Sequence, residues 1–247
     1  MRLRLRRKDS GAFHFTFTTS LEKRSKDKVT QMIIGVLALQ GAFMEHIHML
    51  RKLGAECREV RQLSDWTNDL NGLIIPGGES TVMSKLLHDL GLVALIRTSI
   101  SAGLPVFGTC AGLILLAKDI IGGSTSGLKC MDIRVHRNAY GRQLGSFETR
   151  GTFAGRDDIP MVFIRAPYIE SVGKDVEILS TVNGRIVAAC QNNMLATAFH
   201  PELTDDGTVH ICFLHIAETA GFNNRMRPGN SCHDMTGADT RHMTLNM

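Results

Sequence analysis

The chain has 247 residues, of which 43% are hydrophobic and 21% charged, the balance of an ordinary globular protein. This composition excludes collagen-like, coiled-coil and wholly disordered proteins, and no apolar run approaches the roughly 18 residues that cross a bilayer. The net charge of +4 is carried by the ends: residues 1–28 have nine basic and three acidic side chains, whereas residues 29–222 have 16 basic and 19 acidic ones. We therefore expect the body of the protein to bind neither nucleic acid nor membrane.

The two ends of the chain lack the pattern of a folded core. Residues 1–31 contain no secretory hydrophobic segment but are rich in Arg, Ser and Thr, so they suit either a transit peptide or a tail that precedes a functional start at Met32. Residues 223–247 are polar and without periodicity. We expect both ends to be disordered and residues 32–222 to form one domain. The expected location is the cytoplasm, unless the basic head directs the protein to an organelle.

Cysteine and histidine spacing gives no sign of a disulfide framework or a metal site. The six cysteines lie far apart with no Cys-x-x-Cys pair, which favours reduced thiols. The pairs His46-x-His48 and Cys212-x-x-His215 are isolated, and packing in a helix or strand explains them better than zinc. We expect no metal.

Strands and helices alternate along the first half of the body. Continuous apolar runs at 32–39, 73–78 and 104–108 are typical of strands buried on both faces of a parallel sheet, and a shorter strand is expected at 57–60. Helical spacing follows at 43–53, at 80–90 with Ser80 as the cap, at 92–102, and again from Ala111. This pattern predicts an α/β fold with a doubly wound, mostly parallel sheet and helices on both faces.

The second half of the body changes character. Short alternating runs occupy 131–137, 161–167, 176–182 and 185–191, with a turn signal at Asn183-Gly184. They predict a short antiparallel extension of the same domain. A last strand at 195–199 precedes His200, and a final helix is expected at about 206–220.

The sharpest local motif is Gly108-Thr109-Cys110-Ala111-Gly112, which lies between an apolar strand and an apolar helix. This is the context of a nucleophile elbow, in which small flanking residues permit a sharp turn and the helix N-terminus favours a thiolate. A small buried cysteine would satisfy the same pattern, so the motif alone leaves both interpretations open.

A second motif, His200-Pro201-Glu202, changes that balance. In extended chain, residues i and i+2 point the same way, so His200 could act as base toward Cys110 while Glu202 orients the imidazole. Both motifs end core strands and can meet at the same edge of the sheet. Together they favour a Cys–His–Glu triad.

The third motif, at residues 76–81, reads Pro-Gly-Gly-Glu-Ser-Thr and again joins a strand to a helix. Its two glycines would let backbone N–H groups approach a ligand and form an oxyanion hole with the N–H of Ala111. A tight turn or a phosphate cradle would also suit it. Because the motif lacks the Gly-Lys-Ser/Thr of a Walker loop, a nucleotide site is disfavoured.

With these motifs in order, the chain resembles the class I glutamine amidotransferases and, within them, the family of glutaminase subunits of pyridoxal 5′-phosphate synthase. The resemblance covers about residues 32–220. It rests on IGVLALQGAFMEHI (34–47), LIIPGGEST (73–81), FGTCAGLILLAK (107–118), HRNAYGRQLGSFE (136–148), FIRAPYI (163–169) and ATAFHPELTDD (196–206). Amidotransferases in general share the elbow and the His-Pro-Glu. The Leu-Gln-Gly opening, the Arg-Asn-x-x-Gly-x-Gln-x-x-Ser-Phe stretch and the Ile-Arg-Ala-Pro segment are particular to the narrower family.

The resemblance implies hydrolysis of L-glutamine to L-glutamate and ammonia through a glutamyl thioester. It makes Cys110 the nucleophile, His200 the general base and acid, and Glu202 the residue that orients His200. The other implied positions are glutamine contacts at Gly78, Glu79, Ser80, Arg137, Ile164 and Arg165, an oxyanion hole at Gly78 and Ala111, and an activation relay at Gln40. No cofactor is implied. The ammonia would pass to a separate (β/α)8 synthase subunit within a large hetero-oligomer.

Several alternatives remain at this point. The chain could be an amidotransferase that serves another pathway, a γ-glutamyl hydrolase, or a cysteine peptidase of similar topology. It could also be a non-catalytic module that regulates a partner. The stretches particular to the narrower family weigh against the first two, and the intact triad positions weigh against the last.

Overall fold

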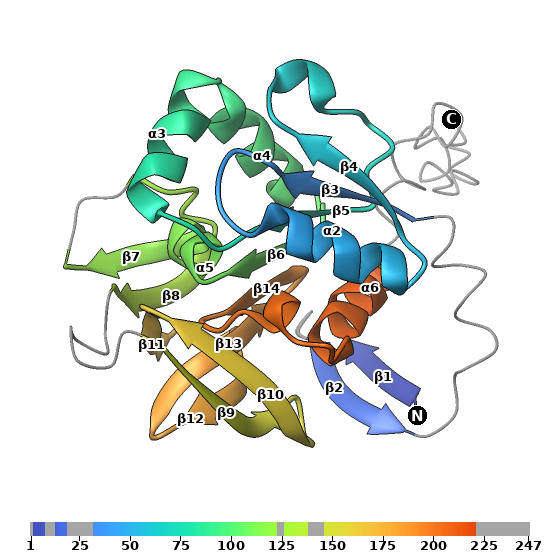
Figure 1. Ribbon diagram of the computed structural model, residues 1–247, viewed down its shortest axis with the longest axis vertical. Helices are drawn as coiled ribbons and strands as arrows, with labels where there is room; N and C mark the ends of the chain where they lie inside the picture. Colours follow the sequence, from blue (N-terminus) through green and yellow to red (C-terminus); the bar gives the residue numbers. More distant parts are fainter. Residues whose placement is uncertain (1, 8–12, 19–31, 123–125, 138–145, 221–247) are drawn as a thin grey trace, which may run out of the picture.

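The computed structural model of the protein describes residues 2–7, 13–18, 32–122, 126–137 and 146–220 (Figure 1). The predicted tail at 223–247, Cys232 and the centre of the stretch 136–148 lie outside these residues. None of the helices in the described ranges is long and apolar enough to cross a membrane.

Five parallel strands form the centre of the molecule, in the order β4 (Glu56–Val60), β3 (Ile33–Leu37), β5 (Gly72–Ile75), β6 (Val106–Thr109) and β14 (Met194–Thr197). The inner strands β5, β6 and β14 are buried at every residue, as strands covered on both faces should be. The predicted parallel sheet is confirmed. Because Thr109 pairs with Thr197, the segments after β6 and β14 start side by side at one edge of the sheet.

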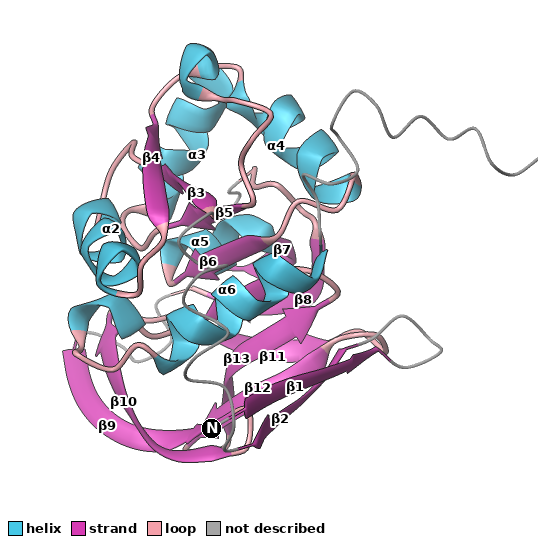
Figure 2. Ribbon diagram, turned by 90° about the vertical axis from the view of Figure 1, so that its right-hand side faces the viewer, coloured by secondary structure: helices cyan, strands magenta, loops and turns pink. Residues whose placement is uncertain are grey.

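Helices cover both faces of this sheet, as predicted (Figures 1 and 2). On one face, Phe107 of β6 contacts His210 and Phe213 of α6 (Thr208–Ala220) and a side chain of α2 (Phe43–Lys52). Gly108, the next residue of β6, faces the opposite side, where the backbone of α5 (Ala111–Leu116) approaches it closely. On that side α3 (Ser80–Asp89) contacts both α5 and α4 (Leu92–Ser101).

Beyond β14 the sheet continues with antiparallel pairing, so the predicted extension is confirmed. It passes through β13 (Arg185–Gln191), β11 (Tyr168–Val172) and β8 (Met131–His136), with β12 (Glu177–Val182) paired to β13 and β7 (Ala117–Ile121) parallel to β8. A separate hairpin consists of β9 (Ser146–Phe153) and β10 (Arg156–Ile164). This hairpin passes close to the elbow, because His200 donates its backbone N–H to the carbonyl of Val162 at 2.8 Å.

Three details of this region differ from the prediction. The helix that starts at Ala111 ends at Leu116, because residues 117–121 pair with β8 as a strand instead of continuing the helical pattern. The strands β9 and β11 were not predicted. Their sequences, SFETRGTF and YIESV, contain too few apolar residues to show a clear alternation, and pairing with β10 and β8 holds them in place.

The expectation that residues 1–31 are disordered differs from the structure at two segments. β1 (Arg2–Arg7) and β2 (Phe13–Thr18) pair with each other as a two-stranded antiparallel sheet. Both segments alternate with a period of two, Leu between Arg residues in the first and Phe between His or Thr in the second, which is the pattern of a strand. The high charge of the segment obscures this alternation when composition alone is considered.

Candidate active site

Cys110 lies in the turn between β6 and α5, at the carboxyl edge of the sheet. Its φ of 47° and ψ of −96° fall in a region that residues with a Cβ rarely adopt. Its backbone N–H donates to the carbonyl of Thr197 at 2.8 Å, which ties the turn to β14. The crossing of strand and helix is so close that a Cβ on Gly112 would lie 2.0 Å from the carbonyl oxygen of Ile75. The chain therefore makes the sharp, strained turn of a nucleophile elbow here.

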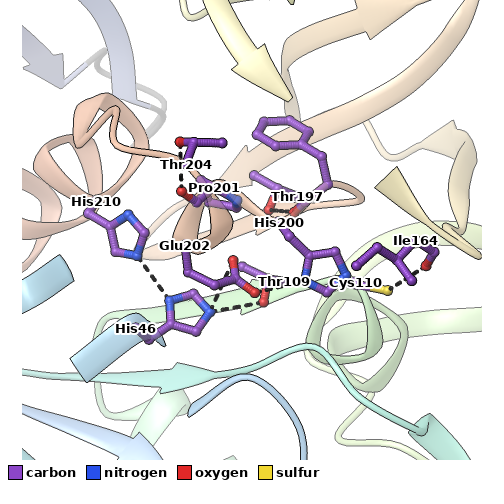
Figure 3. Close-up of polar contacts among 11 residues, drawn as sticks. His46, Thr109, Cys110, Ile164, Thr197, His200, Pro201, Glu202, Thr204 and His210 are labelled. Atoms are coloured by element: carbon purple, nitrogen blue, oxygen red, sulfur yellow. Dashed lines mark hydrogen bonds and ion pairs between the residues drawn. The ribbon is translucent and has the colours of Figure 1, made fainter. Parts of the chain in front are cut away.

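His200 and Glu202 lie beside this turn, as the motif predicts, but not in extended chain. The residues Pro201–Leu203 form a short 3₁₀ turn, η2, which folds the Glu202 carboxylate back so that Oε1 lies 2.7 Å from Nδ1 of His200 (Figure 3). Both side chains are buried. The predicted proximity of histidine and carboxylate is therefore present, although the geometry that produces it is a tight turn and not a strand.

The electrostatics of these groups favour a charged imidazole. Burial lowers the pKa of His200, but hydrogen bonds to Cys110 and Glu202 outweigh burial and raise this pKa to about 10. Burial likewise raises the pKa of the Glu202 carboxyl, but the proximity of His46 and the hydrogen bond from His200 lower it overall. A protonated His200 beside an ionised Glu202 can stabilise a thiolate at Cys110.

Two further histidines lie behind Glu202, and the sequence motifs did not indicate them. Nε2 of His46 is 3.4 Å from Oε2 of Glu202 and 3.1 Å from Oγ1 of Thr109. Nδ1 of His46 is 2.9 Å from Nε2 of His210 (Figure 3). Neither histidine is exposed. Nothing in the sequence around either histidine marks it as part of the site, and the packing of α2 against α6 brings the two rings together behind the carboxylate.

The loop between β5 and α3 closes over the histidine. A Cβ on Gly77 would lie 2.3 Å from Cε1 of His200, and one on Gly78 would lie 2.5 Å from Oε1 of Gln40. Oε1 of Gln40 accepts the backbone N–H of Glu79 at 2.7 Å. Both glycines are therefore needed for close approach, and Gln40 is attached to the same loop that was predicted to hold oxyanion donors.

The first turn of α3 is capped differently from the prediction. Glu79 is the N-cap residue, and its side chain accepts the backbone N–H of Thr81 at 3.3 Å. Ser80, the predicted cap, is instead the first helical residue and is buried. Its backbone already has helical geometry, so Glu79, which is still extended, takes the cap position.

The remaining predicted positions are Arg137, Ile164, Arg165 and Ala111. Nη2 of Arg137 is 3.7 Å from Oε1 of Glu79 and 3.2 Å from Oγ1 of Thr81. The carbonyl oxygen of Ile164 is 3.9 Å from Sγ of Cys110. Arg165, which follows it, is exposed and has a φ of 44°. Ala111 is the first residue of α5, directly after the cysteine.

Comparison with known proteins identifies the family of this chain. The chain matches the model of the SNO glutamine amidotransferase family over residues 36–219. It belongs to this family. Two relatives are each described as pyridoxal 5′-phosphate synthase subunit PdxT. The one from Streptococcus pneumoniae is 58% identical over 190 residues, 76% of this chain and 98% of that protein. The one from Methanocorpusculum labreanum is 60% identical over 185 residues, 75% of this chain and 97% of that protein.

Solved structures support the same membership in the amidotransferase family. A crystal structure of a glutamine amidotransferase is similar with a TM-score of 0.71 at 44% identity, and covers 74% of this chain and 98% of that one. A putative GMP synthase subunit from Thermoplasma acidophilum is similar with a TM-score of 0.57 at 20% identity, and the match covers 79% of this chain and 98% of that one. At this low identity, the similarity supports the fold alone. The resemblance inferred from the sequence motifs is therefore confirmed.

Proposed function

We propose that this chain is the glutaminase subunit of a pyridoxal 5′-phosphate synthase. It hydrolyses L-glutamine to L-glutamate and ammonia, and the ammonia passes to a (β/α)8 synthase subunit. The observation that carries the proposal is the identity of 58% and 60% to two PdxT proteins over nearly their whole length. The arrangement of Cys110, His200 and Glu202 supplies chemistry that fits that assignment.

The first half of the reaction is acyl transfer to the cysteine. His200 holds the proton of the Cys110 thiol, and the thiolate attacks the side-chain amide carbon of glutamine. The backbone N–H groups of Gly78 and Ala111 stabilise the negative oxygen of the tetrahedral intermediate. His200 then gives its proton to the departing nitrogen. The C–N bond breaks, ammonia leaves, and a glutamyl thioester remains on Cys110.

The second half is hydrolysis of that thioester. A water molecule gives a proton to His200 and adds to the thioester carbon, and the C–S bond then breaks. Glutamate leaves and His200 keeps the proton beside the restored Cys110 thiolate, so that one glutamine and one water yield one glutamate and one ammonia. Throughout, Glu202 keeps the ring of His200 in place and stabilises its charged form through the 2.7 Å hydrogen bond to Nδ1.

Charged groups near the elbow suit a zwitterionic substrate. Arg137 and Glu79 lie 3.7 Å apart, so a positive and a negative group are presented together. The guanidinium suits the α-carboxylate of glutamine, and the Glu79 carboxylate suits its α-ammonium. Ser80, Ile164 and Arg165 complete the proposed contacts. The carbonyl oxygen of Ile164, 3.9 Å from Sγ of Cys110, faces the place where the amide would react.

A reconstituted complex tests the proposal. The purified chain should release ammonia from glutamine slowly or not at all by itself, and much faster with its synthase partner. With Cys110→Ala, the complex should lose glutamine-dependent formation of pyridoxal phosphate but keep formation from an ammonium salt. Glutamine-dependent synthesis by that variant would contradict the mechanism, and no stimulation by the synthase would contradict the assignment of the partner.

Gln40 connects the proposed docking of the synthase to the oxyanion hole. Its side chain is bonded to the backbone N–H of Glu79, next to the proposed oxyanion donor Gly78. We propose that docking of the synthase acts on this contact, since a shift of Gln40 would change the orientation of the 78–79 peptide. Gln40→Ala should therefore reduce the stimulation by the synthase more than it reduces the activity of the isolated chain.

A further inference from the structure

The proposed reaction uses one oxygen of Glu202 and leaves the other unexplained. Oε1 holds His200, whereas Oε2 points away from the elbow into the layer between α2, α6 and the sheet (Figure 3). Among the described residues, Oε2 has no hydrogen-bond partner by strict geometry, and Nε2 of His46 lies 3.4 Å from it. A buried carboxylate oxygen without a donor would be costly, so the role of His46 needs an explanation.

The contacts of His46 decide where its proton lies. Its Nδ1 and Nε2 of His210 are 2.9 Å apart, so one of the two nitrogens donates and the other accepts. If Nδ1 of His46 donated, its Nε2 would carry a lone pair toward the Glu202 carboxylate, which is repulsive, and His210 would bury an N–H on its own unpartnered Nδ1. If Nε2 of His210 donates instead, His46 is protonated on Nε2, facing Glu202 and Thr109.

We propose that His46 is a positioning residue for the glutaminase reaction, which donates its Nε2–H toward Oε2 of Glu202, and that His210 fixes His46 in this tautomer. The proposal rests on the proposed function, because its effect is exerted through Glu202 on His200. The line of contacts runs from Cys110 through His200, Glu202 and His46 to His210, and every side chain in it is buried.

Both rings have the protonation state that this role requires. Burial lowers the pKa of His46, although the nearby Glu202 opposes it, and burial lowers the pKa of His210 to about 3. The titratable groups that face Glu202 are His200 from its own turn and His46 from α2. His200 and Glu45 also act on His46, and both Glu202 and His46 act on His210 of α6. A neutral His46 ring can donate to Oε2 of Glu202 without neutralising the carboxylate, whose negative charge stabilises protonated His200.

Two amide replacements of His46 separate positioning from packing. The side-chain nitrogen of glutamine can take the place of imidazole Nε2, whereas that of asparagine takes the place of Nδ1. His46→Gln should therefore keep the donor to Glu202, and His46→Asn should lose it. With the synthase present, we expect kcat to fall about 10- to 100-fold in His46→Asn, with KM for glutamine little changed, and only a few-fold in His46→Gln.

The pH profile provides a readout that packing alone would not move. Without the donor, the pKa of the buried Glu202 carboxyl should rise, so the acidic limb of kcat/KM should move to higher pH in His46→Asn and stay in place in His46→Gln. The pH dependence of Cys110 alkylation by iodoacetamide, followed on the Cys110 peptide by mass spectrometry, should shift in the same direction. This second measurement needs neither glutamine nor the synthase.

The outcomes separate this proposal from the proposed function. If the unaltered chain with its synthase releases no ammonia from glutamine, the proposed function fails, and the alkylation profiles alone decide the role of His46. Equal losses in His46→Asn and His46→Gln with unmoved pH profiles would overturn the positioning role. If His46→Asn does not fold, His210→Asn and His210→Gln test the same line, since only the second keeps the Nε2 donor, and equal effects again overturn it. His215→Asn, on the outer side of α6, is the control and should resemble the unaltered chain.

Discussion

Gly77 allows a prediction that separates the catalytic geometry from the stability of the fold. A Cβ on this residue would lie 2.3 Å from Cε1 and 2.9 Å from Nδ1 of His200. The backbone of Gly77 is not in the left-handed region, so alanine can adopt its conformation without strain. The obstacle to Gly77→Ala is therefore the imidazole itself, which must move away.

The size of that movement sets the expected loss. Ordinary van der Waals contact starts at 3.4 Å, so the ring must shift by about 1 Å or more. Such a shift breaks the 2.7 Å hydrogen bond to Glu202 and changes the position of the ring relative to Cys110. A misplacement of about 1 Å typically costs on the order of 100-fold in rate, or about 2.7 kcal/mol of activation free energy. We expect kcat/KM for glutamine to fall by that factor while the protein remains folded.

The assay is ammonia release from glutamine in the presence of the synthase, with thermal unfolding measured on the same samples. Gly207→Ala is the matched control, because the nearest atoms to its Cβ would be the flexible ends of Leu53, at 3.1 Å, and Ile211, at 3.7 Å. The control should keep both activity and unfolding temperature. A Gly77→Ala variant that is folded and within threefold of the parent in kcat/KM would refute the role given to this contact, as would a loss of activity that only follows unfolding.

Three further predictions follow from single contacts. Gly112→Ala places a Cβ 2.0 Å from the backbone oxygen of Ile75, and such overpacking should lower the free energy of unfolding in urea by about 1–3 kcal/mol or more. Arg137→Ala should raise KM for glutamine by about 10- to 100-fold with a smaller change in kcat, in steady-state assays, because it removes the proposed partner of the α-carboxylate. The pKa of His200 is about 10 in the folded protein against about 6.5 in the unfolded chain, so the protonated ring stabilises the fold fully below pH 6.5 and this gain is lost as the pH rises through 10. Below pH 6.5 the parent protein should unfold at a higher temperature than His200→Asn. This difference in unfolding temperature should become smaller as the pH rises from 6.5 to 10.

Features fixed by neighbouring residues could be predicted from the sequence. The turn at Cys110 needs small residues on both sides, and the structure places Gly108 and Gly112 where added methyl groups would collide with backbone. Continuous apolar runs predicted β3, β5 and β6 because a strand covered on both faces has no polar side. The resemblance added the positions of Gln40 and Arg137, which both prove to contact the loop around Glu79.

Features that depend on the meeting of distant segments could not be predicted in this way. His46 and His210 are 164 positions apart, each in a helix whose pattern needs only a buried face. A histidine on such a face is compatible with simple packing, and no motif connects the two. The 3₁₀ turn at 201–203 was missed for a different reason. Treating residues 200–202 as extended chain overlooked Pro201, which suits the first position of a turn, and the bend that folds Glu202 back is held by local hydrogen bonds.

The identity of residue 46 also bears on why the charge at Glu202 is useful. A lysine or arginine at this position would satisfy the buried carboxylate more strongly, but its permanent charge would compete with His200 for the same anion and lower the pKa of His200. An apolar residue would leave Oε2 without a donor and favour the protonated acid. A neutral imidazole, whose proton is directed by His210, avoids both effects. It keeps Glu202 ionised, and the negative charge of Glu202 remains available to stabilise protonated His200. On this reasoning, His46→Lys should lower the pKa of His200 and reduce the fraction of Cys110 that is present as thiolate, even if the variant is as stable as the parent.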